Sequence, residues 1–274
     1  MKASFFPNYD KQGTEEIFKA SVKILKSVGV ECYAAEANDA GCSVLSEDKL
    51  YETADVIITI GGDGTLIKYA KKASRYGKPC LGINTGRLGF LTNLEKDQIE
   101  LLKKLVSGEY SVEDRMMLSV KMISEGKTVY DGIALNDAVI SSGSVAKITD
   151  ICLDVSGDEI GYRADGVIFS TPTGSTAYSM SAGGPIIDPK VRCITVTPIC
   201  SHSLTARPML AHESAEMRVS LKESSRTTAY LTVDGKRCGE VGDEATIIIS
   251  VSPFDAKLIN ISANTIYKTV SKKF

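Results

Sequence analysis

Asp55-Val-Ile-Ile-Thr-Ile-Gly-Gly-Asp-Gly-Thr65 is the stretch of the sequence that decides the fold. Its first six residues form a β-branched run, which is typical of a parallel strand buried on both faces. The glycines that follow favour a tight turn, and the residues after Thr65 have the spacing of an amphipathic helix that ends near Gly77. A strand, a glycine turn and a helix in this order indicate a parallel sheet covered by helices.

The segments on either side continue this alternation of helix and strand. Apolar residues at three- and four-residue spacing predict a first helix, for which Gly29 supplies a left-handed stop. Together these signals place the first part of the chain in the α/β class, with a Rossmann-like parallel sheet. The expected elements are helices over 14–28 and 98–106 and strands over 30–34 and 79–83.

The hydrophobic period changes near residue 112, where apolar and polar residues begin to alternate. Such alternation over 118–122 and 151–155, with turn residues after each run, is typical of antiparallel strands. We therefore predict an α/β domain over 1–112 and a β-rich domain over 113–274. The last residues of the second domain can pack back on the first. Further short runs stand at 166–170, 217–221, 229–233, 246–251 and 257–261.

Composition and charge exclude several classes of protein. The chain has 274 residues, 43% of them hydrophobic, and its net charge of −2 lacks the basic footprint of a nucleic-acid-binding protein. No apolar run approaches the roughly 18 residues that cross a bilayer, and no signal-peptide core precedes Pro7. Seven cysteines without a CxxC pair indicate reduced thiols. We expect a cytoplasmic protein with neither nucleic acid nor membrane as a partner.

The glycine turn Gly61-Gly62-Asp63-Gly64-Thr65 has the composition of a phosphate-binding loop. Glycines let the backbone approach phosphate oxygens, and the following helix points free N–H groups and its positive end at them. A carboxylate repels phosphate, so Asp63 makes sense beside the phosphates, where it faces a hydroxyl nucleophile or a metal ion. The alternative is a plain strand-to-helix turn in which Asp63 caps the helix.

A second polar segment, from Arg163 to Tyr178, combines a strand with a turn rich in hydroxyl groups. Such a turn offers hydrogen bonds to sugar hydroxyls and phosphates, and the ring of Tyr178 offers a flat face for a base. The alternative is a solvated Ser/Thr turn, which accounts for most segments of this composition. Small residues over 179–188 favour the binding site, because they permit a ligand or a helix to approach closely.

Two further segments carry weaker signals. Asn84 to Phe90 follows an expected strand at the place where open α/β sheets bind ligands; its alternative is a loop with Phe90 in the core. Asn136 and Asp137 suit either the hydroxyls of a ribose or the end of a strand. Histidine-dependent catalysis and zinc sites have little support from two histidines, and the sequence contains neither a P-loop nor a GxGxxG fingerprint.

Taken together, these motifs resemble the NAD kinase family. A GGDGT loop alone also occurs in diacylglycerol, sphingosine and phosphofructokinase relatives, but here the motifs follow the family's order over most of the chain. The matching stretches are GGDGT at 61–65, NTGRLGFL at 84–91, Leu-Asn-Asp at 135–137, DGVIFSTPTGSTAYSMSAGGPI at 165–186, PICSHSL at 198–204 and Val-Asp-Gly at 233–235.

The resemblance implies an enzyme that phosphorylates the 2′-hydroxyl of the adenosine ribose of NAD with ATP, giving NADP. It also implies a divalent metal ion, Mg²⁺ held through ATP rather than by a protein ligand, and a site between two domains. A homodimer or homotetramer is implied as well. The competing functions are a lipid or sugar kinase that shares the GGDGT loop, and a sensor that binds NAD without turning it over.

The resemblance also assigns roles to individual residues. Asp63 takes the place of the general base, while Asp137 stands where the family usually has Glu and Lys236 stands where many members have Gln. The residues placed at the ATP phosphates are Gly61, Gly62, Gly64, Thr65 and Lys68. The residues placed at NAD are Asp63, Gly64, Phe90, Asn136, Asp137, Lys147, Arg163, Asp165, Thr173, Thr176, Ala177, Tyr178, Ser179, Met180 and Ser181, with Asp234 and Lys236 in addition.

Overall fold

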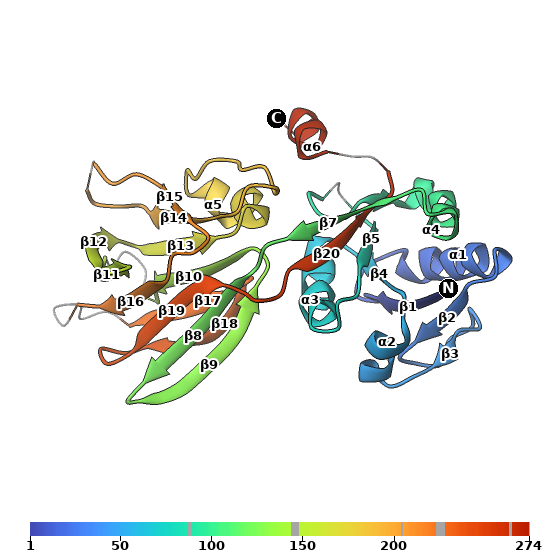
Figure 1. Ribbon diagram of the computed structural model, residues 1–274, viewed down its shortest axis with the longest axis horizontal. Coiled ribbons are helices and arrows are strands. Elements are labelled where there is room, and N and C mark those ends of the chain that lie inside the picture. The colour runs from blue at the N-terminus through green and yellow to red at the C-terminus, as the bar shows by residue number, and fades with distance from the viewer. Residues whose placement is uncertain (87–88, 144–147, 204, 223–227, 263–264, 274) are drawn as a thin grey trace. The chain divides into compact units, whose positions relative to one another are not determined.

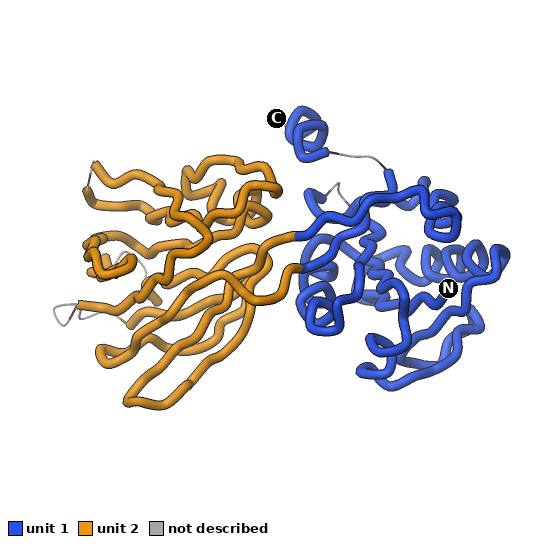
Figure 2. Tube along the Cα trace, viewed as in Figure 1, with its two compact units in different colours: residues 1–114, 256–274 blue, residues 115–255 orange. Residues whose placement is uncertain are grey.

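The chain folds as two compact units in the computed structural model (Figure 2). The structure describes residues 1–274 except 87–88, 144–147, 204, 223–227, 263–264 and 274. Unit 1 comprises Met1–Asp114 and Ala256–Phe274, and unit 2 comprises Arg115–Asp255. Each unit has its own sheets and its own apolar core.

Unit 1 is built on one eight-stranded sheet, much of it parallel (Figure 1). All six residues at its centre over 56–61 are buried, which is the burial that a β-branched run predicts for a strand covered on both faces. In sheet order the strands are β3 (Ser43–Val44), β2 (Glu31–Ala34), β1 (Lys2–Pro7), β4 (Val56–Gly61), β5 (Cys80–Asn84), β20 (Ala256–Asn260) and β7 (Ser111–Arg115), with β6 (Leu94–Glu95) paired to β5.

The sequence predicted three helical segments of unit 1, of which two differ from the expectation, and it did not predict the helices over 47–53 and 266–273. The helix expected after Thr65 already begins at Asp63, because Gly62 is its extended N-cap residue and an acidic side chain suits the first turn. The helix expected over 98–106 is instead a 3₁₀ segment, opened by a capping box, that continues into a short α-helix. The elements are α1 (Thr14–Ser27), α2 (Glu47–Thr53), α3 (Asp63–Ser74), η1 (Lys96–Lys103), α4 (Lys104–Ser107) and α6 (Ile266–Lys273).

The structure corrects the prediction for the run at 257–261, which the sequence groups with the antiparallel strands. Residues 257–260 of this run lie in β20, which pairs in parallel with β5 through Leu258 and Cys80 and so belongs to the sheet of unit 1. Ile259 and Ile261 pack into the apolar core of that unit. Alternation alone does not distinguish a parallel from an antiparallel partner, because both kinds of strand have a two-residue period.

Unit 2 contains two six-stranded sheets that share one apolar core. Strands such as β8 and β11 alternate buried and partly exposed residues, as the sequence predicts. In order, the strands of one sheet are β15 (Met209–His212), β14 (Cys193–Ile199), β13 (Gly166–Ser170), β10 (Asp137–Ser142), β17 (Ala229–Val233) and β18 (Lys236–Val241). Those of the other are β12 (Asp158–Ala164), β11 (Thr149–Val155), β16 (Met217–Leu221), β19 (Thr246–Val251), β8 (Leu118–Ser124) and β9 (Lys127–Ala134).

The hydroxyl-rich segment covers the second face of one of these sheets. Every residue of β13 and β14 is buried, so both faces of these strands are covered. The segment after β13 forms η2 (Thr173–Thr176) and α5 (Tyr178–Ser181), and Ala182 packs on Ile168 and Ile199. The turn is therefore anchored to the sheet by an apolar contact.

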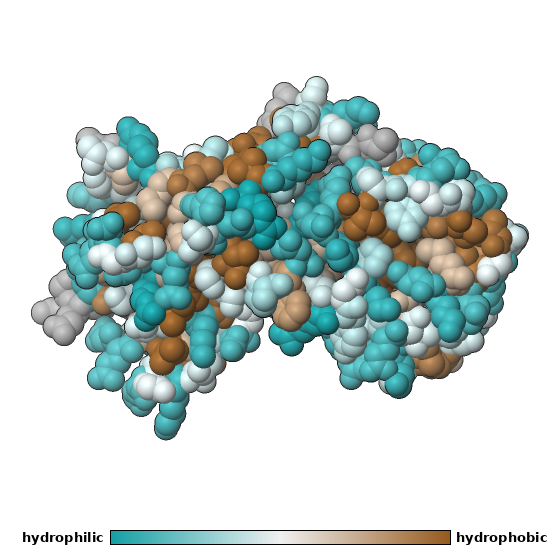
Figure 3. All heavy atoms as spheres, viewed as in Figure 1, coloured by the Kyte–Doolittle hydropathy of each residue, from teal (hydrophilic) through white to brown (hydrophobic). Residues whose placement is uncertain are grey.

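The surface carries hydrophilic side chains over much of the face seen in Figure 3. Among the described residues, no helix has the length and apolar character required to cross a membrane. All seven cysteines are free thiols, of which Cys200 is exposed.

Candidate functional site

The glycine loop lies at a switch point of the sheet in unit 1. β1 and β4 are parallel neighbours, but the chain leaves β1 toward β2 on one side and β4 toward β5 on the other. Right-handed crossovers in opposite directions put the connecting helices on opposite faces, which leaves a crevice beyond the carboxyl ends of the two strands. The loop over 8–13 and the loop over 61–65 meet at this crevice.

A cavity of about 580 Å³ lies at these two loops. Asn8 Nδ2 donates a hydrogen bond to Thr65 Oγ1 at 3.1 Å, which joins one loop to the other. A Cβ on Gly61 would lie 2.4 Å from the same oxygen, so this position requires glycine. Two basic residues, Lys11 and Lys68, are among those that line the cavity. The cavity is lined by Pro7, Asn8, Tyr9, Asp10, Lys11, Gly62, Gly64, Thr65, Lys68 and Tyr69.

The sequence identified only one side of this cavity. Gly62, Gly64, Thr65 and Lys68 line it, and Gly61 ends the strand that leads into it. The other side, the loop after β1 with Asn8 and Lys11, was not predicted from the sequence. The sequence signal that could have found these residues is a polar loop with a lysine that directly follows a strand of the same parallel sheet.

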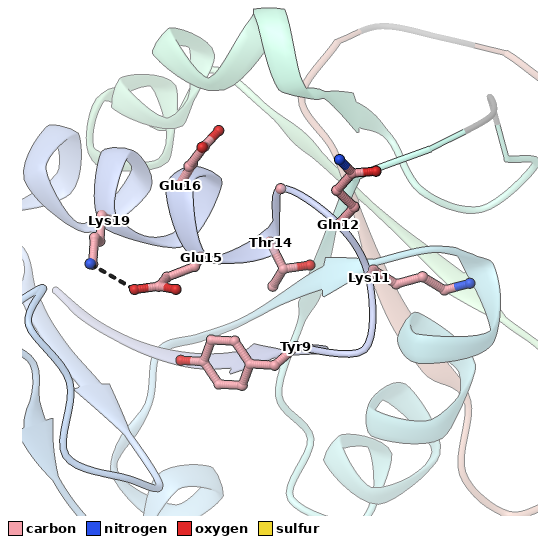
Figure 4. Close-up of a pocket in the computed structure, with 8 residues that line it drawn as sticks. Tyr9, Lys11, Gln12, Thr14, Glu15, Glu16 and Lys19 are labelled. Carbon is pink, nitrogen blue, oxygen red and sulfur yellow. Dashed lines mark ion pairs between the residues drawn. The ribbon is translucent and has the colours of Figure 1, made fainter.

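A second cavity of about 520 Å³ adjoins the first at Tyr9 and Lys11, which line both (Figure 4). It lies at the first turn of α1, where free N–H groups and the positive end of the helix favour negative charge. Glu15 forms an ion pair with Lys19 at 2.7 Å, drawn as a dashed line in Figure 4. The side chain of Tyr9 is exposed and offers an aromatic face between the two cavities.

Asp63 is held by the backbone of the segment that follows β5. Its Oδ2 accepts a hydrogen bond from the N–H of Phe90 at 2.7 Å. Its Oδ1 accepts from the N–H groups of Leu91 and Thr92 at 3.2 and 2.9 Å, and from the Thr92 hydroxyl at 3.0 Å. A Cβ on Gly89 would lie 2.1 Å from Oδ1, so the segment approaches the carboxylate closely. The first carboxylate of α3 is thus fixed in orientation by four donors.

These contacts do not use the whole accepting capacity of the Asp63 carboxylate. Each oxygen of an ionised carboxyl group has about two acceptor positions. Oδ1 has three donors, whereas Oδ2 has one among the described residues, the N–H of Phe90. One acceptor position on Oδ2 therefore remains for a hydroxyl group or another donor.

In unit 2 the hydroxyl groups of the Ser/Thr-rich turn divide into two sets. Thr171, Ser175 and Ser179 are fully buried and build the turn. Ser175 Oγ accepts from the N–H of Ile187 at 3.0 Å, and Ser179 Oγ shares a 3.0 Å hydrogen bond with Thr197 Oγ1. These three hydroxyls are therefore not solvated, as the alternative for this segment assumed, but serve to hold the turn together. The residues that keep an accessible surface are Thr176, Ala177, Tyr178, Met180 and Ser181.

Asn136 and Asp137 lie where β10 begins, beside this turn. The N–H of Thr171 donates to the carbonyl oxygen of Asn136 at 2.9 Å. The side-chain oxygen Oδ1 of Asn136 is buried and has no hydrogen-bond partner among the described residues. Asp137 is 5% exposed, and burial, followed by the charge of Asp234, raises the pKa of its carboxyl group to about 7. Such an amide and carboxyl pair is poised to bind the donors and acceptors of a ligand.

The other assigned residues have different surroundings. The ring of Phe90 lies 4.0 Å from the ammonium group of Lys273, which gives this ring a cationic neighbour in unit 1. Arg163, two-thirds exposed, faces Asp150 at 3.9 Å. Asp165 joins β12 to β13, and its carbonyl oxygen accepts from Ser142 at 2.8 Å. Lys147 lies outside the described residues, and Lys236 is exposed at the start of β18.

No cluster of three or more His, Cys, Asp or Glu side chains suitable for a metal ion occurs in the part of the chain that the structure describes. Mg²⁺ in phosphoryl-transfer sites is often held by one or two carboxylates together with the phosphates of the substrate, so such a cluster is not required.

Both units match models of one protein family. Residues 5–110 match the ATP-NAD kinase N-terminal domain, and residues 135–261 match the ATP-NAD kinase C-terminal domain. An NAD kinase of Acetivibrio thermocellus is 35% identical over 280 aligned positions, which cover 100% of this chain and 96% of the relative.

Two solved structures have the same fold. A yeast NADH kinase complexed with NADH superposes with a TM-score of 0.86 at 23% identity, covering 99% of this chain and 85% of the other. An NAD kinase from Archaeoglobus fulgidus in complex with ATP gives a TM-score of 0.79 at 29% identity, covering 100% and 98%. The agreement extends over both units and over 96% of a curated relative, and this chain therefore belongs to the NAD kinase family.

Proposed function

We propose that the protein transfers the γ-phosphoryl group of ATP to the 2′-hydroxyl of the adenosine ribose of NAD, which yields NADP and ADP. The family and its curated members make it an ATP-dependent NAD kinase. The observation that carries the chemistry is the Asp63 carboxylate within the glycine loop, with one acceptor position of Oδ2 that the described residues do not use. A lipid or sugar kinase would share the glycine loop but not the match of unit 2.

The donor phosphates are proposed to lie in the cavity at the two loops of unit 1. The N–H groups of Gly62, Gly64 and the first turn of α3 offer hydrogen bonds to phosphate oxygens without a Cβ in the way. Lys11 and Lys68 balance the phosphate charge. A divalent ion, Mg²⁺ held through the ATP phosphates, would neutralise the charge that develops as the phosphoryl group transfers.

The proton of the attacking hydroxyl is proposed to move to Asp63. The four donors fix the carboxylate, so Oδ2 is oriented before the substrate arrives. As the ribose oxygen bonds to the γ-phosphorus, the bond to the β–γ bridging oxygen breaks and the hydroxyl proton passes to Oδ2. A carboxylate is a sufficient base, because the hydroxyl becomes acidic only as the new bond forms.

The acceptor NAD is proposed to be bound by the residues that the family resemblance assigns to it. Asn136 and Asp137 suit ribose hydroxyls, and Tyr178, 46% exposed, offers its ring to a base. The remaining residues of this proposal are Gly64, Phe90, Lys147, Arg163, Asp165, Thr173, Thr176, Ala177, Ser179, Met180, Ser181 and Lys236.

Replacing Lys68 with Ala is expected to raise the KM for ATP about tenfold and to leave the KM for NAD nearly unchanged, because one charge-assisted phosphate contact is lost. Initial rates with each substrate varied in turn measure this. Lys71 is on the same helix but is not among the residues that line the cavity, so Lys71→Ala is the matched control. Equal effects of the two substitutions on the KM for ATP would remove Lys68 from the donor site.

Replacing Thr92 with Val is expected to lower kcat about five- to tenfold, because one hydroxyl donor to Asp63 is lost while three N–H donors remain. Thr92→Ser keeps the hydroxyl and should restore turnover. Turnover numbers and thermal unfolding are compared for both variants. If Thr92→Ser is as slow as Thr92→Val, the hydroxyl does not orient the carboxylate.

Incubation with NAD, ATP and Mg²⁺, followed by detection of NADP with an NADP-specific dehydrogenase, tests the proposed function. NAD binding without NADP formation would favour the sensor instead. We also propose that the protein is cytoplasmic. We further propose that it forms a homodimer or homotetramer, and light scattering on the purified protein would measure the molar mass of that assembly.

A further inference from the structure

A tight turn in unit 2 carries a carboxylate that the proposed chemistry does not use. β17 and β18 pair through Val233 and Lys236, which leaves the two-residue loop Asp234-Gly235. Both loop residues have positive φ, 46° for Asp234 and 75° for Gly235. Positive φ at both positions is the geometry of a type I′ hairpin turn, in which Asp-Gly and Asn-Gly are the favoured pairs.

In this turn the Asp234 carboxylate receives three consecutive backbone N–H groups from the start of β10. Oδ2 accepts from Leu135 at 3.0 Å, and Oδ1 accepts from Asn136 at 2.7 Å and from Asp137 at 3.2 Å. The N–H of Asp234 donates in return to the carbonyl oxygen of Asp137 at 3.0 Å. Hydrogen bonds to an ionised acceptor are roughly twice as strong as neutral ones. The contact therefore fixes this short segment from one side.

The hydroxyl-rich turn fixes the same segment from the other side. Thr171 Oγ1 donates to the carbonyl oxygen of Leu135 at 2.6 Å, and the Thr171 N–H donates to that of Asn136. A Cβ on Gly174 would lie 2.1 Å from the carbonyl oxygen of Asn136, so the two segments are in close contact. With its backbone held on both sides, the segment presents side chains in one orientation.

We propose that Asp234 is a positioning residue for the dinucleotide: by holding the backbone over 135–137, it aims the side chains of Asn136 and Asp137 at the ribose of NAD. The inference rests on the proposed function, in which those two side chains bind NAD. Asp234 acts through this backbone rather than by touching NAD, because its two oxygens face N–H groups. Its charge also contributes to the raised pKa of Asp137, after burial.

Two substitutions separate the carboxylate from the turn that carries it. Asp234→Gly removes the carboxylate and suits the positive φ, so the hairpin is preserved. Asp234→Asn keeps one oxygen acceptor and the favoured Asn-Gly pair, but replaces the other oxygen with an NH₂ group that faces a donor. Asp243→Asn is the control, an exposed carboxylate in the turn after β18.

The measurements are initial rates with NAD and ATP each varied in turn, calorimetric titration with NAD, and thermal unfolding. Asp234→Gly should raise the KM and the dissociation constant for NAD by about ten- to a hundredfold, and Asp234→Asn by less. The KM for ATP should stay within about twofold, a selectivity that a general loss of stability would not produce. Asp243→Asn should behave as the wild type.

The outcomes separate this inference from the proposed function. If the wild type forms no NADP, the proposed function fails, and the NAD titrations of the wild type and Asp234→Gly still decide whether Asp234 supports binding. The positioning role is overturned if NAD binding by Asp234→Gly equals that of the wild type, or if the KM for ATP rises as much as that for NAD. Should the glycine variant not fold, the same criteria apply to Asp234→Asn.

Discussion

Asp63→Asn is expected to lower kcat by about 10²- to 10⁴-fold while NAD binding is largely kept, because the amide cannot accept the proton of the 2′-hydroxyl. The amide oxygen can take the place of Oδ1 and keep its three donors. The NH₂ group then faces the N–H of Phe90, where Oδ2 accepts a hydrogen bond in the wild type. The geometry of the loop is thus largely retained while the proton acceptor is removed.

Single-turnover and steady-state rates with ATP and Mg²⁺, together with a calorimetric titration with NAD, measure the two parts of this expectation. Asp48→Asn is the matched control, an exposed carboxylate at the start of α2 that pairs with Lys72 at 2.8 Å. It should have the turnover of the wild type. Near-normal kcat in Asp63→Asn would show that this carboxylate does not take part in the chemistry.

Asp137→Asn is expected to stabilise the protein at pH 8 by up to about 4 kcal/mol, and to weaken NAD binding at the same time. Burial raises the pKa of the Asp137 carboxyl group from 3.8 to about 7. The folded protein therefore binds a proton more tightly than the unfolded chain does. Above pH 7 the folded state holds an ionised carboxylate in a buried place, and an amide in the same place avoids that cost.

The sign of the pH dependence follows from the direction of this pKa shift. Between about pH 4 and pH 7 the folded state carries more protons at this site than the unfolded state, so the free energy of unfolding falls as pH rises. The difference in stability between Asp137→Asn and the wild type should therefore be small near pH 4, grow through this window and be constant above it.

Denaturant unfolding of both proteins at pH 4, 6 and 8, followed by a probe in unit 2, measures this difference. Asp243→Asn, which changes an exposed carboxylate of the same unit, should leave the pH dependence of unfolding as in the wild type. A gap between Asp137→Asn and the wild type that does not change with pH would show that folding does not raise the pKa of the Asp137 carboxyl group.

The sequence predicted those features that depend on residues close together along the chain. The buried strand before the glycine turn, the turn itself and the helix after it follow from β-branched residues, glycines and apolar spacing, and all three are present. The alternation of hydrophobic residues predicted the antiparallel sheets of unit 2 in the same way. Each of these signals is complete within about ten residues.

Other features depend on which strands become neighbours. Alternation placed 257–261 with the antiparallel strands, whereas the sheet of unit 1 takes it up as a parallel neighbour of β5. Asn8 and Lys11 reach the cavity of the glycine loop only because β1 and β4 lie side by side. No local pattern states that pairing.

By itself the sequence determined the class of fold, the motif that carries the chemistry, and the residues that carry the family resemblance. Only the tertiary structure decided how those residues are oriented. The N–H groups that hold Asp63 come from 27 to 29 positions further along the chain, and those that hold Asp234 from 97 to 99 positions earlier. Hydrogen bonds over such separations depend on strand register and on loops meeting in space, whereas sequence patterns reflect only the period of a single element.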